Sequence, residues 1–208
     1  MNEAPPREDA ARRRRGDHEW MSEELDPLLE ALKWVAVAFK DAGLPFALAG
    51  GYAAYARGGP QSGHDVDFVI REEDVAAAKE ALERRGITTL QPPEDWLFKA
   101  RHGGEQVDVI FRLAMGPVDA ELLRRADQLS VGSVEMPVMS ATDVLISKLR
   151  AMTEHSCDLA PALAVMRSLR EQLDMDAIDE SSKGHPFAEA ALHVARALGV
   201  LPATGGPR

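Results

Sequence analysis

The sequence contains almost no cysteine and no long apolar run. Its single cysteine, Cys157, excludes an internal disulfide and a cysteine-based zinc cluster. No apolar stretch approaches the roughly 20 residues that a membrane-crossing helix needs. The first residues also lack the apolar core of a secretory signal. We therefore expect a cytoplasmic protein with no membrane partner.

The chain also lacks the excess of basic residues that a general nucleic-acid-binding protein carries. Its net charge is −10 over 208 residues, and contacts with phosphates need a dense basic face. A run of four arginines at residues 12–15 lies in a charged segment without apolar periodicity. Residues 1–18 are therefore predicted to be a flexible basic tail. A solvated tail and a local contact with nucleic acid both account for the run.

Hydrophobic periodicity predicts helices at both ends of the chain, with strands and two further helices, GYAAYARGG and EEDVAAAKEALERRG, between them. Apolar residues recur at three- and four-residue steps within residues 19–42, and Gly43 closes that helix. Two apolar-striped segments near the C-terminus, LAPALAVMRSLREQL and PFAEAALHVARALG, are predicted to be helices that pack on each other. The segments predicted to be strands or extended are FALAG, DVDFVI, ITTLQ, LFKARH, QVDVIFRL and VGSVEMPVM. This order predicts an α+β N-terminal part followed by a helical C-terminal part.

Two aspartates alternate with apolar residues in the predicted strand DVDFVI. Asp65 and Asp67 are two residues apart, so their carboxylates point to the same face. Two like charges that lie so close raise each other's pKa unless a cation lies between them, and Mg²⁺ prefers such oxygen ligands. Asp108 lies in a similar apolar strand and joins this cluster if the two strands pair. A solvent-facing strand edge remains the alternative for these acids.

A glycine pair precedes the acids and favours a phosphate site. Gly50 and Gly51 end an apolar strand and begin a short helix, and glycine lets a backbone approach phosphate oxygens closely. Ser62 stands just before the acidic strand, where a phosphate contact and a plain turn role are equally compatible with its position. Glycines and paired acids together predict a site in which two Mg²⁺ ions hold a triphosphate and activate a hydroxyl.

The stretch LAGGYAAYARGGPQSGHDVDFVI resembles the signature of the DNA-polymerase-β-type nucleotidyltransferase superfamily. That signature is an apolar residue, Gly–Gly or Gly–Ser, a spacer, and two acids separated by one apolar residue. A third acid on a later strand belongs to it, and Asp108 fits that position. The resemblance implies a small mixed sheet, rich in antiparallel pairs, with flanking helices. It divides the chain into a core at residues 19–139, a helical region at 140–202 and a loose tail at 203–208.

The segment MPVMSATDVLISKLRAM is similar to a helix of the AbiEii/MenT-type toxin nucleotidyltransferases. In those families a lysine on this helix contacts nucleotide phosphates, and Lys148 takes that position. In those families an acid follows this helix, often in a Lys–Asp pair. Asp158 matches that acid only in part, because Cys157 stands where the lysine would be. The resemblance implies transfer of a nucleoside monophosphate from an NTP to a hydroxyl, with the tRNA 3′ end as acceptor and a cognate antitoxin as partner. Asp65, Asp67 and Asp108 would bind the metal, and Asp108 would also help to deprotonate the acceptor.

Two other functions stay open on the sequence. A His–Asp–x–Asp form, as at His64, also occurs in antibiotic nucleotidyltransferases of the lincosamide and aminoglycoside type, and the acidic body is compatible with a cationic drug. A non-catalytic nucleotide-binding protein should have lost one of the acids, and all three are present. Trp20, Trp34 and Trp96 are interpreted as core or interface residues rather than base-stacking platforms. Lys99 and Arg101 lie two residues apart on a predicted strand and therefore share a face. They are either exposed strand charges or residues that line a path for a nucleotide or RNA.

Overall fold

The computed structural model describes residues 26–62 and 65–203, and its centre is one mixed sheet. The strand order is β3-β4-β5-β2-β1-β9-β8. Four neighbouring pairs are antiparallel, whereas β2 pairs with β5, and β1 with β9, in parallel. The predicted α+β class with an antiparallel-rich sheet is therefore confirmed. The strands are β1 (Phe46–Ala49), β2 (Val66–Ile70), β3 (Thr88–Leu90), β4 (Leu97–His102), β5 (Glu105–Ile110), β8 (Asp127–Val131) and β9 (Val134–Val138).

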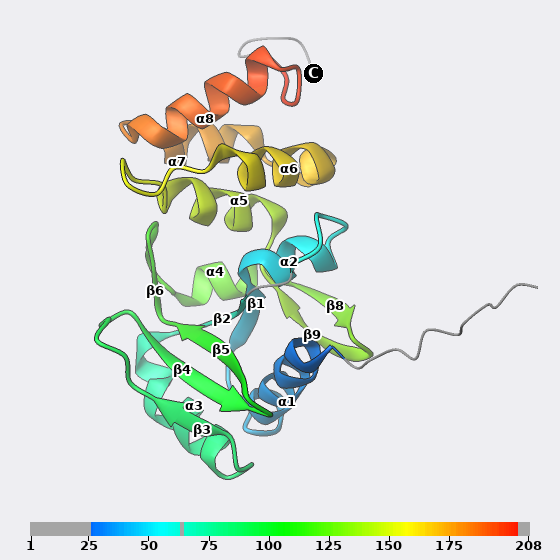
Figure 1. Cartoon of the computed structure of the whole chain (residues 1–208), viewed down its shortest axis with the longest axis vertical. Helices are drawn as coiled ribbons and strands as arrows, with labels where there is room; N and C mark the ends of the chain where they lie inside the picture. Colours follow the sequence, from blue (N-terminus) through cyan, green and yellow to red (C-terminus); the bar gives the residue numbers. More distant parts are fainter. Residues whose placement is uncertain (1–25, 63–64, 204–208) are drawn as a thin grey trace, which may run out of the picture.

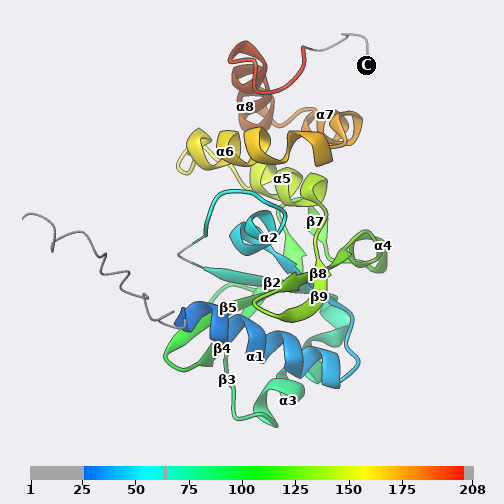
Figure 2. The same ribbon diagram turned by 90° about the vertical axis from the view of Figure 1, so that its right-hand side faces the viewer.

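Helix α1 (Pro27–Asp41) covers one face of this sheet, and α3 (Val75–Glu83) packs beside it (Figure 2). Phe39 of α1 meets Phe46 and Phe68 with ring centroids 5.4 and 5.9 Å apart. Asp26 caps α1 by accepting a hydrogen bond from the backbone N–H of Leu28 at 3.1 Å. The earlier part of the predicted helix, like the predicted N-terminal tail, lies outside the described residues.

Four helices follow β9 and stack at one end of the molecule (Figure 1). The short α2 (Gly50–Ala56) lies between this stack and the sheet, contacting α5 on one side and β1 and β2 on the other. The predicted packing of the two C-terminal apolar helices is confirmed by the contact of α6 with α8. The four helices are α5 (Ala141–Arg150), α6 (Leu159–Leu169), α7 (Met175–Ser182) and α8 (Pro186–Ala197).

Several elements differ from the sequence prediction. The segment predicted as QVDVIFRL breaks at Phe111, whose N–H bonds to the carbonyl of Trp96, and a separate short hairpin follows. That hairpin joins β6 (Arg112–Leu113) to β7 (Gly116–Pro117). The single extended piece VGSVEMPVM is in fact one half of the β8–β9 hairpin. The short α4 (Ala120–Arg124) and the 3-10 turns Glu72–Asp74 and Arg170–Gln172 complete the described elements.

The division into residues 1–18, 19–139, 140–202 and 203–208 stays a prediction. Within residues 26–62 and 65–203, no helix is both long and apolar enough to cross a membrane.

Candidate active site

A cavity of about 450 Å³ opens where β1 ends, where β2 begins and where α5 and α6 face the sheet. Pro161 and Val165 give it an apolar wall from α6. The structure brings together here most of the residues that the sequence selected. Those that line the cavity are Gly50, Gly51, Ser62, Asp65, Asp67 and Lys148.

The glycine pair makes room for two side chains of this cavity. Gly50 has a φ of +60°, and a Cβ at this position would lie 1.8 Å from Oδ2 of Asp67. A Cβ on Gly51 would lie 2.3 Å from Oγ of Ser62. Any larger residue would therefore displace the carboxylate or the hydroxyl. The glycines have a structural role here in addition to the phosphate role that the sequence predicted.

The acids lie on neighbouring strands, as the sequence predicted conditionally. Asp67 of β2 is directly opposite Asp108 in the parallel pairing of β2 with β5. Asp67 points away from α1, because side chains alternate along a strand and the next residue, Phe68, contacts α1 through Phe39. Asp65 is exposed and immediately precedes β2. Asp65 and Asp67 therefore line the cavity, whereas Asp108 lies beside Asp67 on the neighbouring strand and is not part of the cavity lining.

The environment of Asp67 disfavours its negative charge. Burial is the largest cause, and the charges of Asp108 and Asp65 add to it, so the pKa of Asp67 is raised from 3.8 to about 6. Lys148 and Lys99 act in the opposite direction. Lys148 makes no hydrogen bond or ion pair with the described residues, so its ammonium group is free to face a bound anion. The cavity thus combines excess negative charge on the sheet with one unpaired cation on α5.

Asp108 has a partner that the sequence analysis missed. Nζ of Lys99 donates to both of its carboxylate oxygens, at 2.8 and 3.1 Å. The two residues are opposite each other in the antiparallel pairing of β4 with β5. The signal was present in the sequence, because counting outward from the Gly103–Gly104 turn pairs residue 99 with residue 108. Lys99 therefore neither lines a path nor stands free, since its charge is used at the third acid.

The three acids do not form a ready-made metal cluster. Among residues 26–62 and 65–203, no group of three or more His, Cys, Asp and Glu side chains is placed to hold a metal ion. One physical reason is that the ammonium group of Lys99 occupies the cation position next to Asp108. The donor set nevertheless suits Mg²⁺, which takes carboxylate oxygens. The raised pKa of Asp67 indicates the uncompensated charge that such a cation would balance.

Asp158 and Arg57 have structural roles in this arrangement. Asp158 is exposed and caps α6 by accepting a hydrogen bond from the N–H of Ala160 at 3.0 Å, and it does not line the cavity. Arg57 is turned away from the cavity toward β8 and β9. Its guanidinium group donates to the carbonyl of Met139 at 2.5 Å and to Asp127 at 2.7 Å. Arg57 thereby joins α2 to the far edge of the sheet.

The chain is similar to several solved structures, all at low sequence identity. The solution structure of the antibiotic-resistance factor ANT(2'')-Ia aligns with a TM-score of 0.56 at 16% identity, covering 82% of this chain and 97% of that one. This likeness shows a common fold. The lincosamide antibiotic adenylyltransferase LnuA, with lincomycin bound, aligns with a TM-score of 0.47 at 12% identity, covering 65% and 92%. A tRNA nucleotidyltransferase complexed with a primer tRNA and an ATP analog aligns with a TM-score of 0.38 at 16% identity, covering 81% and 52%.

No curated protein matches the sequence. A family model does match, over residues 4–205, which is nearly the whole chain. The nucleotidyltransferase resemblance that the motif predicted is thereby confirmed, while the polymerase-β type and the toxin-type subgroup stay predictions. The chain belongs to the family described as uncharacterised nucleotidyltransferase.

Proposed function

We propose that this nucleotidyltransferase moves a nucleoside monophosphate from an NTP to the 3′ hydroxyl of an RNA, with tRNA as the preferred acceptor and Mg²⁺ as the cofactor. The observation that carries the proposal is that Gly50, Gly51, Ser62, Asp67 and Lys148 all line the same cavity. The toxin-type resemblance of the α5 segment supports RNA as the acceptor. It also suggests that a cognate antitoxin protein is the regulatory partner.

Each group of the cavity has a defined role in this reaction. Lys148 would pair with the triphosphate, while Gly50, Gly51 and Ser62 would seat the β- and γ-phosphates. Mg²⁺ ions, held by Asp65, Asp67 and Asp108, would supply charge neutralisation at the triphosphate and activate the hydroxyl. The acceptor oxygen bonds to the α-phosphorus as the bond to pyrophosphate breaks. Asp108 lies on the neighbouring strand to receive the hydroxyl proton.

The pairing of Lys99 with Asp108 constrains this scheme. While both oxygens of Asp108 accept from Lys99, the ammonium group competes with a metal ion or a proton for that carboxylate. Binding of the cation and substrate would have to move the ammonium group of Lys99 away. Such a change is modest, because Lys99 is only half-buried and its side chain is flexible.

The test is transfer of label from each α-labelled NTP to total tRNA in the presence of Mg²⁺. Asp65→Ala combined with Asp67→Ala should abolish transfer, whereas Glu80→Ala with Glu171→Ala should retain it. The second pair removes the same charge from well-exposed positions. EDTA should stop the reaction and added Mg²⁺ should restore it. Absence of transfer to tRNA from each of the four NTPs would refute the RNA proposal.

A second candidate acceptor is an antibiotic. The net charge of −10 favours a cationic drug over a polyanion. One solved structure of ANT(2'')-Ia holds adenylyl-2''-tobramycin, so tobramycin is a suitable probe. Transfer to tobramycin or lincomycin without transfer to tRNA would favour this candidate.

A further inference from the structure

A second cavity, of about 460 Å³, shares no lining residue with the first. Ile110 connects it to the site, because it lies two residues beyond Asp108 on β5 and therefore points to the same face. Two residues of strand span roughly 6.6 Å. Helix α5 separates the two cavities. Ser147 lines the second cavity, and the next residue, Lys148, lines the first.

The position of the second cavity fits the acceptor side of the reaction. The first cavity includes the glycines, Ser62 and Lys148, which suit a triphosphate. Asp108, the acid proposed to act on the acceptor, lies on the strand that leads into the second cavity. A hydroxyl held at Asp108 would therefore belong to a molecule whose remaining part lies over Ile110.

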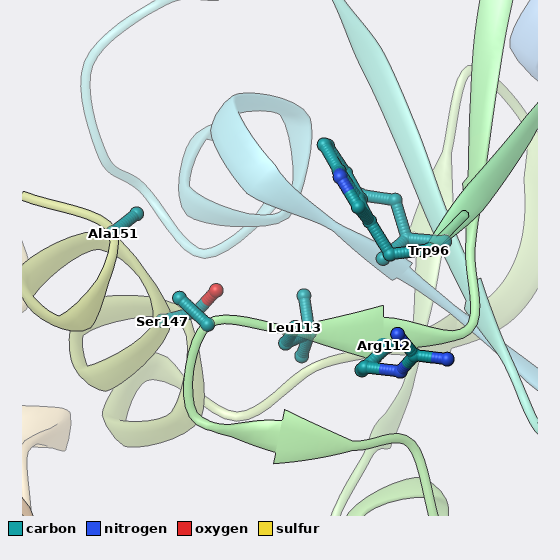
Figure 3. Close-up of a pocket in the computed structure, with 7 residues that line it drawn as sticks. Trp96, Arg112, Leu113, Ser147 and Ala151 are labelled. Carbon is teal, nitrogen blue, oxygen red and sulfur yellow. The ribbon is translucent and has the colours of Figure 1, made fainter. Parts of the chain in front are cut away.

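Trp96 presents an aromatic ring to this cavity (Figure 3). Its carbonyl accepts hydrogen bonds from the N–H groups of Phe111 at 3.0 Å and Arg112 at 3.3 Å, which hold its backbone. Trp96 is nevertheless 39% exposed, so of the two roles that the sequence suggested, core and interface, the core role is wrong. An exposed ring on a fixed backbone is the kind of surface on which nucleobases stack.

The polar groups of the cavity suit a nucleotide better than a polycation. Arg112 is paired only weakly, with Asp95 at 3.2 Å and Glu72 at 3.8 Å, and both partners are well exposed. Its guanidinium group can therefore exchange these partners for a phosphate. The hydroxyl of Ser147 makes no hydrogen bond with the described residues. The residues that line the cavity include no carboxylate, which a polycationic drug would require.

We propose that this cavity binds the terminal nucleoside of the acceptor RNA. The base stacks on Trp96, Arg112 faces the phosphate that precedes it, and Ser147 donates to or accepts from the base edge. The 3′ hydroxyl then reaches Asp108. This assignment rests on the proposed function, because it takes RNA as the acceptor.

Binding of RNA tests the subsite independently of catalysis. A short single-stranded RNA with a 5′ fluorophore and a free 3′ hydroxyl is titrated with the full chain without NTP, and the dissociation constant is read from anisotropy. Trp96→Leu should raise the dissociation constant for RNA about tenfold or more, which is the effect expected from the loss of one stacked base. Trp34→Leu is the matched control, since Trp34 is 43% exposed on α1 and should leave binding unchanged. Thermal unfolding confirms that both variants fold.

Steady-state transfer distinguishes failure of the subsite from failure of the proposed function. Trp96→Leu should raise KM for RNA and leave KM for NTP unchanged. Transfer to RNA with an unaltered KM for RNA in this variant would overturn the subsite and leave the function in place. RNA binding that depends on Trp96, without any transfer, would support the subsite and overturn the function. Equal RNA affinity of the native chain and both variants would overturn the subsite. Binding of tobramycin, but not of RNA, that depends on Trp96 would also overturn it.

Discussion

Replacement of Asp67 by asparagine should stabilise the protein at neutral pH when no metal is present. The pKa of Asp67 rises from 3.8 to about 6 on folding, and each pKa unit corresponds to about 1.36 kcal/mol. Ionised Asp67 therefore costs about 3 kcal/mol of folding free energy at pH 7, or about 2 kcal/mol after allowance for its partial exposure. Asparagine has nearly the same shape and carries no charge. We therefore expect Asp67→Asn to raise the free energy of unfolding by about 2 kcal/mol.

The pH dependence fixes the sign of this effect. The folded state holds a proton on Asp67 more tightly than the unfolded state does, so stability falls as the pH rises between about 4 and 6. Near pH 4 the carboxyl group is neutral in the folded state and only about half ionised in the unfolded state, so most of the gain from Asp67→Asn should be lost. Above pH 6 the gain should be complete and constant. Urea unfolding in EDTA at pH 4, 5, 6 and 7 measures the curve.

Asp143 is the matched control, because it is also a buried carboxylate but has a cationic partner. It is 4% exposed and accepts from Arg125 at 2.7 and 3.0 Å and from the hydroxyl of Ser140 at 2.7 Å. Asp143→Asn should therefore destabilise the fold, by about 2 kcal/mol or more. A loss of stability in Asp67→Asn at pH 7, or a gain that persists at pH 4, would refute the reasoning. Added Mg²⁺ should reduce the advantage of Asp67→Asn, because the ion would stabilise only the native carboxylate set.

Two further substitutions test the geometry of the site. Gly50→Ala should reduce transfer at least a hundredfold, because its Cβ would displace a catalytic carboxylate. Gly43→Ala, at a similar φ of +64° with open space around it, should cost about 1 kcal/mol and leave transfer intact. Equal activity of the two variants would contradict this account. Arg57→Met should lower the free energy of unfolding by about 2–3 kcal/mol, because it leaves buried carbonyls unpaired. Arg84→Met loses only an exposed ion pair and should change the free energy of unfolding by less than about 0.5 kcal/mol. Urea unfolding measures both, and a stable Arg57→Met would show that α2 needs no such anchor.

The sequence predicted those parts of the fold whose local pattern and tertiary environment agree. In β2, the apolar residues at 66, 68 and 70 share one face with the contact to α1, while Asp67 lies on the opposite face, where the cavity opens. The glycine pair at 103 and 104 predicted the β4–β5 turn. Both residues have a positive φ there, which glycine adopts readily. The cavity residues were found by the same logic, since the motif is local in sequence.

The sequence could not predict features that depend on neighbours distant in the chain. Strand β8 is a largely exposed edge strand with polar residues, so its pattern did not differ from that of a loop. Helix α7 lies within the region predicted to be helical, but only Ile178 and Ser182 are buried, and so narrow a stripe did not define its bounds. Exposure of Trp96 follows from the break of β5 at Phe111, and no local pattern marks that break.

The two-residue turn at Gly103–Gly104 has a consequence for how this enzyme can vary. The turn sets the register of β4 against β5, and the register alone places Lys99 opposite Asp108. An insertion of one residue in the turn would shift every pair, and a neighbouring apolar side chain would then face the third acid. Relatives should therefore vary freely in the composition of this hairpin tip, within the limits of its positive φ angles, but not in its length. The tip of this hairpin thus acts as a spacer that fixes which side chain faces Asp108.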